Sequence, residues 1–368
     1  MEREELINIT NDLIRFQSTK DRPDEIKKCL QYIKEYFANE KVEVEEFEQN
    51  GKPSLYFSYD GNRSPTIILN GHIDVVEAEP EQFVPRLEGD KLFGRGSVDM
   101  KAGVALFMQA FKSFAKVMPS LGLMIVSDEE IGGCNCSKFL AEKQNFNPQV
   151  IIASEPNQSK TPEEMDVTLM QKGVLWVKFI SSGVAAHGSR PWLGENAADL
   201  LIGAYQEVKN LFPPSSAQDH WQETINLGTF TVDNSPNRVP DKAELVVDIR
   251  FPDSITSKEL LGKIDCVLTN HPTVSYEVIE DEPMLLNKAD DPFLLSFKEL
   301  AEKVTGKPSR LLNECGSSDL RFFSAKGITG INCGPHGKNY HGKDEWVSVK
   351  SMLLYAHVLQ EYIKRHAM

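Results

Sequence analysis

A short apolar run that stops abruptly at polar residues constrains this chain more than any other feature. Residues 67–69 (Ile-Ile-Leu) predict a buried strand, and Asn70-Gly71 ends it with a turn signal. His72 and Asp74 follow directly, and residues two apart in an extended chain point to the same side. A histidine with a neighbouring carboxylate is a common metal-ligand arrangement. Because an isolated His-x-Asp also occurs in surface turns, the interpretation depends on the rest of the chain.

Similar strand ends recur in the first 160 residues. Apolar strands predicted at 121–126 and 150–153 are each followed by acidic residues, and a glycine-rich loop precedes a helix expected at 102–116. Alternation of strand, polar loop and helix is typical of a layered α/β domain, whose strand ends line the site. These strand ends and the loop collect one histidine and five carboxylates, namely His72, Asp74, Asp99, Glu129, Glu130 and Glu155.

The order of elements changes near residue 165. One long strand is predicted at 167–180, and the elements after it are helix 197–211, strands 224–232 and 243–251, helix 257–268 and strand 274–279. This β-α-β-β-α-β order is the ferredoxin-like split arrangement, and α/β alternation resumes from residue 292. We therefore expect an α/β catalytic domain formed by residues 1–168 and 284–368, interrupted by an α+β ferredoxin-like domain at residues 169–283.

The composition restricts the possible partners. The formal net charge is -14, from 40 Lys and Arg residues against 54 Asp and Glu residues, which argues against nucleic acid or an anionic membrane as a partner. The six cysteines lack zinc-finger or disulfide-framework spacing and are expected to be reduced thiols. The N-terminal residues are charged, and no apolar run reaches membrane-spanning length. We expect a soluble, cytoplasmic protein.

The carboxylates gathered at the strand ends would repel one another unless they were protonated or neutralised by cations. A divalent metal is the simplest neutraliser, and histidine with carboxylates suits zinc, while manganese and cobalt are also compatible. Each acidic residue has a structural alternative, since Asp99 could cap the following helix and residues 128–130 could favour a helix N-terminus. A second histidine ligand is expected from the C-terminal part, with His341 as the candidate and His336 as its competitor.

The ordered motifs resemble the M20 family of co-catalytic zinc deacylases and peptidases, which includes acetylornithine deacetylase and succinyl-diaminopimelate desuccinylase. The resemblance covers essentially the whole chain, and its motifs are 71–76 (GHIDVV), 94–103 (GRGSVDMKAG), 128–130 (DEE), 154–156 (SEP) and His341. It implies two divalent metal ions bridged by Asp99, with His72 and Glu155 completing one site and Glu130 and His341 the other. It also implies that Asp74 orients His72 and that Glu129 is the general base.

The inserted domain carries further matches. Residues 186–197 (AHGSRPWLGENA) are similar to the family's lid motif, which implies a homodimer through the lid domain, with His187 stabilising the oxyanion in the active site of the partner subunit. A histidine in a flexible loop is the structural alternative. By resemblance, Asn237 and Arg250 hold the substrate carboxylate, although an ion pair within the fold would equally explain Arg250.

The segment 316–322 (GSSDLRF) resembles the part of the desuccinylases that contacts the acyl end of the substrate. It implies that Gly316 and Ser317 bind substrate, but the usual threonine is Ser317 here and a usual glycine is Leu320. Residues 333–335 (CGP) are closer to the deacetylase pattern, so the motifs leave the acyl group open.

These observations together predict a dinuclear metal-dependent amidohydrolase that cleaves the amide bond of an N-acyl amino acid, of the deacetylase or desuccinylase type used in amino-acid biosynthesis. The alternative is a metallo-exopeptidase acting on dipeptides or small peptides. A dinuclear phosphoesterase would use similar ligands, but no additional basic cluster is placed to receive phosphate. A non-catalytic metal-bound scaffold would be expected to have lost the base, and Glu129 is present.

Overall fold

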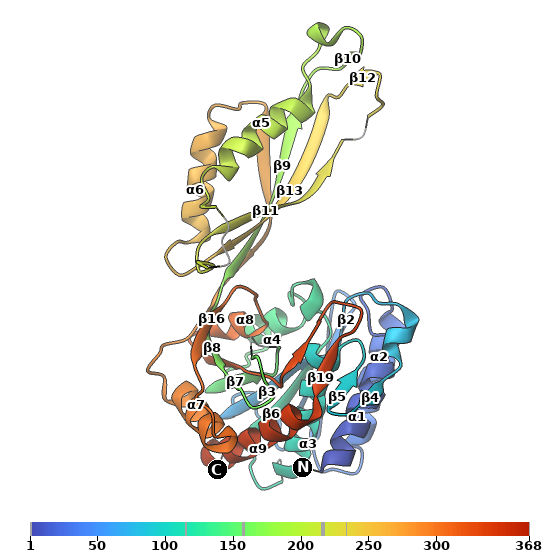
Figure 1. The fold of residues 1–368 in the computed structure, drawn as a ribbon, viewed down its shortest axis with the longest axis vertical. Coiled ribbons are helices and arrows are strands. Elements are labelled where there is room, and N and C mark those ends of the chain that lie inside the picture. Colours follow the sequence, from blue (N-terminus) through green and yellow to red (C-terminus); the bar gives the residue numbers. More distant parts are fainter. Residues whose placement is uncertain (1, 115, 157–158, 215–217, 233, 368) are drawn as a thin grey trace. The chain divides into compact units, whose positions relative to one another are not determined.

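The computed structural model describes residues 2–114, 116–156, 159–214, 218–232 and 234–367. The chain divides into two compact units, which are described separately (Figure 1). The first unit comprises Met1–Met170, Leu285–Leu312 and Ser318–Met368, and the second comprises Gln171–Met284 and Asn313–Ser317. The segment Asn313–Ser317, expected from the sequence to belong with residues 284–368, thus clusters with the second unit. No helix of the described residues is long and apolar enough to cross a membrane.

A nine-stranded mixed sheet forms the centre of the first unit. Its strand order is β1-β2-β6-β3-β7-β17-β8-β15, and β16 pairs with β8. The bounds are β1 (Glu43–Gln49), β2 (Lys52–Ser58), β3 (Ile67–His72), β6 (Leu121–Val126), β7 (Val150–Ala153), β8 (Val167–Gln171), β15 (Leu285–Leu286), β16 (Leu311–Glu314) and β17 (Thr329–Asn332). The central strands β6, β3, β7 and β17 are parallel. Their carboxyl ends therefore lie at one edge of the sheet.

Helices cover both faces of this sheet, because successive strand residues point to opposite faces. Ile67 and Leu69 of β3 enter a core formed with α1, α3, α7 and α9, whereas Ile68 enters a second core with α4 and α8. The helices are α1 (Arg3–Arg15), α2 (Pro23–Tyr36), α3 (Ala102–Phe114), α4 (Ser137–Lys143), α7 (Pro292–Thr305), α8 (Leu320–Ser324) and α9 (Val349–His366). The predicted layered α/β architecture is confirmed.

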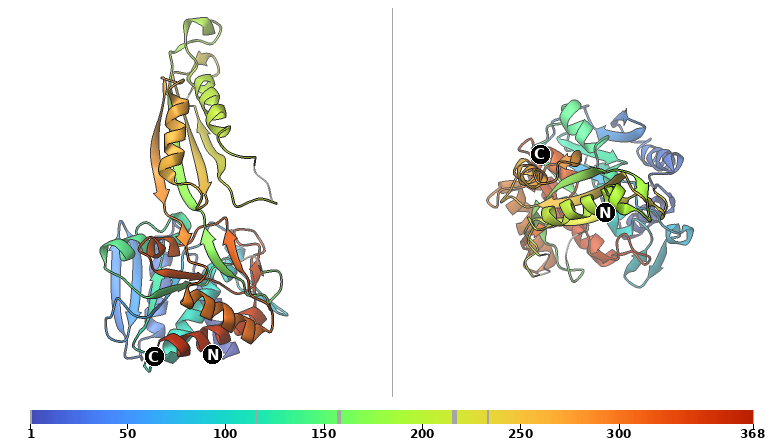
Figure 2. Two further views of the ribbon diagram at one scale, coloured as in Figure 1. Left: turned by 90° about the vertical axis from the view of Figure 1, so that its left-hand side faces the viewer. Right: turned by 90° about the horizontal axis from the view of Figure 1, so that it is seen from above.

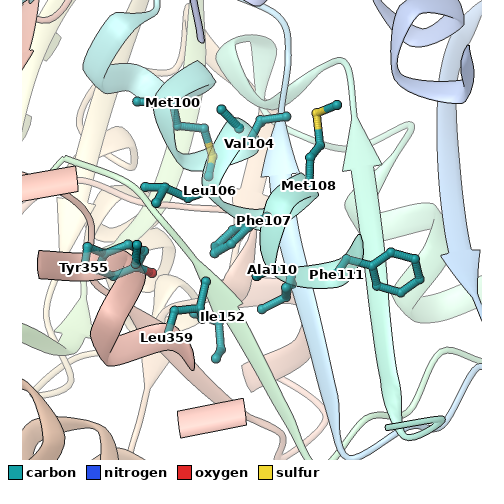
Figure 3. Close-up of a cluster of buried hydrophobic side chains, with 14 of the residues drawn as sticks. Met100, Val104, Leu106, Phe107, Met108, Ala110, Phe111, Ile152, Tyr355 and Leu359 are labelled. Carbon is teal, nitrogen blue, oxygen red and sulfur yellow. The ribbon is translucent and has the colours of Figure 1, made fainter. Parts of the chain in front are cut away.

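The helix α3 is the centre of the larger core. Its residues from Ala102 to Phe111 are all buried, so it is apolar on every side and packs between the sheet and other helices. Figure 3 shows Phe107 of this helix among side chains that include Ile152 of β7 and Leu359 of α9. This packing fixes the start of α3, and therefore the loop before it, relative to the strand ends.

A small antiparallel sheet, not predicted from the sequence, joins distant parts of the first unit. Its strand order is β18-β19-β5-β4, from β4 (Arg86–Glu88), β5 (Lys91–Phe93), β18 (Gly337–Lys338) and β19 (Trp346–Ser348). Pairing of β19 with β5 brings the segment that contains His341 beside the glycine-rich loop that contains Asp99. Short helical turns are found at η1 (Pro80–Phe83), η2 (Ser97–Lys101), η3 (Glu129–Ile131) and η4 (Pro191–Leu193).

The second unit is a four-stranded antiparallel sheet with two helices, and its strand order is β11-β13-β9-β14. The helices α5 and α6 pack against this sheet and share one core with it (Figure 2). The elements are β9 (Gly173–Ser182), α5 (Ala197–Lys209), β11 (Thr224–Thr231), β13 (Lys242–Phe251), α6 (Ser257–Leu268) and β14 (Val274–Glu282), with a short pair β10 (Ala186–His187) and β12 (Arg238–Val239). The β-α-β-β-α-β order agrees with the ferredoxin-like expectation.

One predicted element is wrong. The single strand expected at 167–180 is two strands, since β8 ends at Gln171 in the large sheet and β9 starts at Gly173 in the small one. A Cβ atom on Gly173 would lie 2.2 Å from the ring of Phe251, so the second strand requires glycine at its first position. The apolar pattern continues through this junction. Such a pattern indicates that the chain is extended, but it does not indicate which sheet the extended segment joins.

Candidate dinuclear metal centre

Three parallel strand ends position most of the candidate ligands. His72 is the last residue of β3, and its partner in the register of β6 is Val126. The turn η3, which carries Glu129 and Glu130, begins three residues after Val126, and Glu155 follows β7 by two residues. Because these strands are parallel neighbours, the four side chains start from the same edge of the sheet.

His72, Asp99 and Glu155 form the first group that could hold a metal ion. The His72 Nε2 atom lies 3.2 Å from Asp99 Oδ1 and 3.6 Å from Glu155 Oε1, and the histidine is 1% exposed. Its Nδ1 atom lies 2.9 Å from the backbone carbonyl oxygen of Asp74, whereas the nearest carboxylate oxygen of Asp74 is 3.6 Å away. A donated Nδ1–H leaves Nε2 with its lone pair directed at the ligand group. The main chain of Asp74, rather than the expected carboxylate, makes the shorter contact.

Asp99, Glu130 and His341 form the second group. The His341 Nε2 atom lies 3.2 Å from Asp99 Oδ2 and 3.2 Å from Glu130 Oε2. Within each group the ligand atoms lie within 4.8 Å of one another. Asp99 belongs to both groups and turns one oxygen toward each histidine, which is the arrangement of a carboxylate that bridges two cations. The donor set of two histidines and three carboxylates therefore fits a pair of zinc-like ions.

The charges of the side chains in the two groups show why they favour cations. Hydrogen bonds to Asp99 and Glu130 raise the pKa of His341 to about 10. Burial alone would lower the pKa of His72, but the surrounding carboxylates, Glu155 foremost, raise it well above its usual value. Burial raises the pKa of Glu155 to about 7, and burial also raises the pKa of Glu130. Protons on the histidines thus balance the carboxylates, and a divalent cation would displace them.

Glu129 lies beside the cluster but belongs to neither ligand group. Burial raises its pKa well above the usual value, and the neighbouring carboxylates of Glu155, Asp319 and Glu130 act in the same direction. The Asp74 carboxylate accepts a hydrogen bond of 2.9 Å from the backbone N–H of Glu130, so Asp74 fixes the turn that carries both glutamates. The structure therefore provides one carboxylate for a ligand and an adjacent one that is free of that role.

Arg95 and Glu345 support the backbone that carries Asp99, and Glu345 is one of the acidic neighbours of His341 that could act as an outer contact of the metal ligands. They form a buried ion pair of 2.6 Å, and Glu345 also accepts a hydrogen bond of 3.2 Å from the backbone N–H of Asp99. Charged residues are rarely fully buried unless they are paired, but no local pattern links positions that are 250 residues apart. The competitor histidine, His336, is buried with its Nδ1 atom 3.0 Å from the carbonyl oxygen of Ser159, and it belongs to neither group.

The predicted substrate-binding residues all belong to the second unit, whereas both metal-ligand groups belong to the first. His187 and Asn237 line a shallow surface depression of about 430 Å³. The Nδ1 atom of His187 accepts a hydrogen bond of 3.2 Å from the backbone N–H of Ser189. Nδ1 also lies 2.8 Å from the hydroxyl oxygen of Ser189, so both of these contacts are made by Nδ1 and not by Nε2.

Arg250 has partners within the second unit. Its Nε atom donates to Asp248 Oδ1 at 2.8 Å, and its Nη1 atom lies 3.5 Å from the hydroxyl of Ser317. The ion pair that the sequence left open as an alternative is thus present. Ser317 itself donates to the backbone carbonyl of Lys172 at 2.7 Å, and a Cβ atom on Gly316 would meet nothing within 4 Å.

The chain is similar to several known proteins over most of its length. Succinyl-diaminopimelate desuccinylase of Hahella chejuensis is 26% identical over 341 residues, which cover 85% of this chain and 86% of the relative. The enzyme of the same name from Pseudoalteromonas atlantica is 26% identical over 98% of both chains. In fold, an M20 family metallo-carboxypeptidase from Sulfolobus solfataricus matches 99% of both chains with a TM-score of 0.80 at 17% identity.

The family model named Peptidase family M20/M25/M40 matches residues 68–365. This range includes all five candidate metal ligands as well as the whole second unit. The resemblance found in the sequence motifs is confirmed, and the chain belongs to Peptidase family M20/M25/M40, a family of metal-dependent hydrolases.

Proposed function

We propose that this chain is a dinuclear amidohydrolase that cleaves the amide bond of an N-acyl amino acid and releases a carboxylate and a free amine. The single observation that carries the proposal is Asp99, which turns one carboxylate oxygen toward each of two ligand groups. The curated relatives that are named succinyl-diaminopimelate desuccinylase support an acyl amino acid as the substrate class.

In this proposal His72 and Glu155 would hold one cation and Glu130 and His341 the other, and Asp99 would contribute a carboxylate oxygen to each. Zinc is the expected ion for such a ligand set, and cobalt or manganese is the alternative. When bound, the ions polarise the amide carbonyl and lower the pKa of a water molecule.

Glu129 is the proposed general base. Its carboxylate accepts the proton of the attacking water and then delivers it to the nitrogen of the leaving amine, so that the reaction balances as amide plus water giving acid plus amine. This role requires an ionised carboxylate, and cations in the neighbouring groups would lower the pKa that burial has raised. Asp74 supports the role because it holds the backbone of the η3 turn.

Residues of the second unit are proposed to bind the substrate. The guanidinium of Arg250, held by Asp248, suits a substrate carboxylate, and Asn237 would add an amide hydrogen bond. Gly316 and Ser317 are proposed to contact the acyl end. The contacts of Nδ1 with Ser189 leave Nε2 of the exposed His187 for another partner, which supports its proposed role as an oxyanion donor.

We also propose a homodimer through the second unit, in which His187 serves the partner subunit's active site. Its support is the family motif around His187 and the exposed apolar side chains Trp192 and Leu193 close to it in sequence. Exposed thiols such as Cys134 and Cys266 support a reducing compartment, and hence a cytoplasmic location.

The alternative is an exopeptidase. Solved structures with the same fold include aminopeptidase PepT of Bacillus cereus, with a TM-score of 0.75 at 19% identity over 99% of this chain and 98% of that one. The experiment that separates the two is amine release from a panel of N-acetyl amino acids, N-succinyl amino acids and dipeptides, using metal-stripped protein to which zinc, cobalt or manganese is returned. Turnover confined to acyl amino acids supports the deacylase, and turnover confined to dipeptides supports the exopeptidase. Absence of turnover on the whole panel with metal bound would contradict the proposal.

A further inference from the structure

The two ligand groups differ in how their histidines are supported. His72 is the last residue of a buried central strand and is 1% exposed. The side chain of His341 is 50% exposed, and the residue has a φ of 61°, a conformation that non-glycine residues seldom adopt. Because burial does not hold His341 in place, other contacts must keep its turn close to Asp99.

Glu345 is the centre of those contacts. Its Oε1 atom accepts hydrogen bonds from the backbone N–H groups of Val98 and Asp99 at 2.9 and 3.2 Å. Its Oε2 atom accepts from the backbone N–H of Gly96 at 2.9 Å and from the Nη1 atom of Arg95 at 2.6 Å. One buried carboxylate thus fixes the loop that presents Asp99, from a position four residues after His341.

Arg95 extends the connection to the histidine turn itself. Its Nη2 atom donates to the backbone carbonyl of Gly342 at 3.0 Å, while its Nη1 atom is paired with Glu345. Gln82 supports the same turn from the outside, with its side-chain nitrogen 2.9 Å from the carbonyl oxygens of both Gly342 and Lys343. The planar guanidinium is suited to hold two acceptors at a fixed separation, which a lysine ammonium on its flexible stem does not do.

We propose that the buried Arg95–Glu345 pair is a clasp that sets the spacing between Asp99 and His341 and thereby determines the affinity of the second metal site. Arg95 and Glu345 are positioning residues, because each acts through the backbone of a loop that carries a ligand. The inference rests on the proposed function in one respect, namely that two cations bind. Asp99 belongs to both groups, but only the second group also depends on the turn of His341. Loss of the clasp is therefore predicted to weaken the group of Asp99, Glu130 and His341 more than the group anchored by the buried His72.

The test is a calorimetric and spectroscopic titration of metal-stripped protein with Co²⁺. Wild-type protein is expected to bind two equivalents. In Glu345→Gln the amide NH₂ would face the donors of Arg95 and Gly96, so the second equivalent should bind about 10- to 100-fold more weakly, as outer contacts of metal ligands typically contribute. The first equivalent, which shares Asp99 but is anchored by the buried His72, should weaken less than the second. Arg95→Lys should weaken the same equivalent.

Asp166→Asn is the matched control. Asp166 is also a buried carboxylate that accepts from a backbone N–H, of Arg310, and from the guanidinium of the same residue. It lies in neither ligand group, so this variant should lose stability and bind both equivalents normally. If Glu345→Gln does not fold, Gln82→Ala removes the two outer hydrogen bonds to the turn and should weaken only the second equivalent.

Equal weakening of both equivalents, or no weakening of either, would overturn the clasp. Binding of a single equivalent by wild-type protein would instead overturn the two-metal proposal and the inference with it. Amine release with saturating Co²⁺ provides an independent readout, since the clasp predicts that excess metal restores kcat in Glu345→Gln.

Discussion

Replacing Glu129 with glutamine tests whether this residue acts as the general base without being a metal ligand. Glutamine has nearly the same shape, and Glu129 belongs to neither ligand group, so both cations should keep all their ligands. An amide cannot accept a proton at neutral pH, and a positioned general base contributes about 10²- to 10⁴-fold to a rate. We expect kcat of Glu129→Gln to fall by that factor, or about 3 to 5 kcal/mol in activation free energy, while KM changes little.

The same substitution should stabilise the metal-free protein. Burial raises the pKa of Glu129 well above its usual value of 4.5. A carboxyl group whose pKa is raised by folding binds its proton more tightly in the folded state, so its contribution to the free energy of unfolding falls as the pH rises above 4.5. Glutamine does not titrate. The melting temperature of metal-free Glu129→Gln should therefore exceed that of metal-free wild-type protein by a margin that grows as the pH rises above 4.5.

The assay combines amine release, metal content and thermal unfolding on the same preparations. Glu130→Gln is the matched control at the next residue, because it removes a ligand of the second group and should lose metal as well as activity. A kcat for Glu129→Gln within about tenfold of the wild-type value, or loss of a metal equivalent from this variant, would refute the assignment of the base.

Three further outcomes follow from the structure. The pKa of His341 is raised to about 10, so its protonated ring should stabilise the metal-free protein fully below pH 6.5, and this stabilisation should be lost as the pH rises toward 10. Because a metal ion must displace this proton, the affinity for metal should rise with pH, and calorimetry should detect proton release. Phe107→Ala should lower the free energy of unfolding by about 3 to 5 kcal/mol in urea titrations, since Phe107 is fully buried; a loss below about 1 kcal/mol would contradict the packing (Figure 3). Gly103→Ala places a Cβ 2.6 Å from that of Ser154, so it should cost about 1 to 3 kcal/mol and weaken metal binding beside Glu155, and a variant as stable as wild type would contradict this close approach.

Much of the site could be predicted because its residues lie at strand ends with strong local signals. The buried run before His72, the acidic pair after the strand that ends at Val126 and the acidic residue after Ala153 are each visible within a few positions of the sequence. Parallel pairing of three consecutive strand ends then brings the side chains together.

What escaped prediction depends on contacts between distant segments. The pairing of β5 with β19 joins residues about 250 positions apart, and short strands of three residues carry little periodicity. The same holds for the pairing of Arg95 with Glu345, because no local pattern links two charged residues that lie 250 positions apart. The break between Gln171 and Gly173 has no periodicity signal, because both strands are extended and apolar, and only the close approach of Phe251 distinguishes the second one.

The most direct test of the dinuclear account is an anomalous difference map from crystals of the zinc-loaded protein. A dinuclear centre predicts two peaks in this map, about 3.5 to 4 Å apart. One peak should lie beside His72 and Glu155 and the other beside Glu130 and His341, with Asp99 between them. A single peak, or peaks away from these residues, would contradict it.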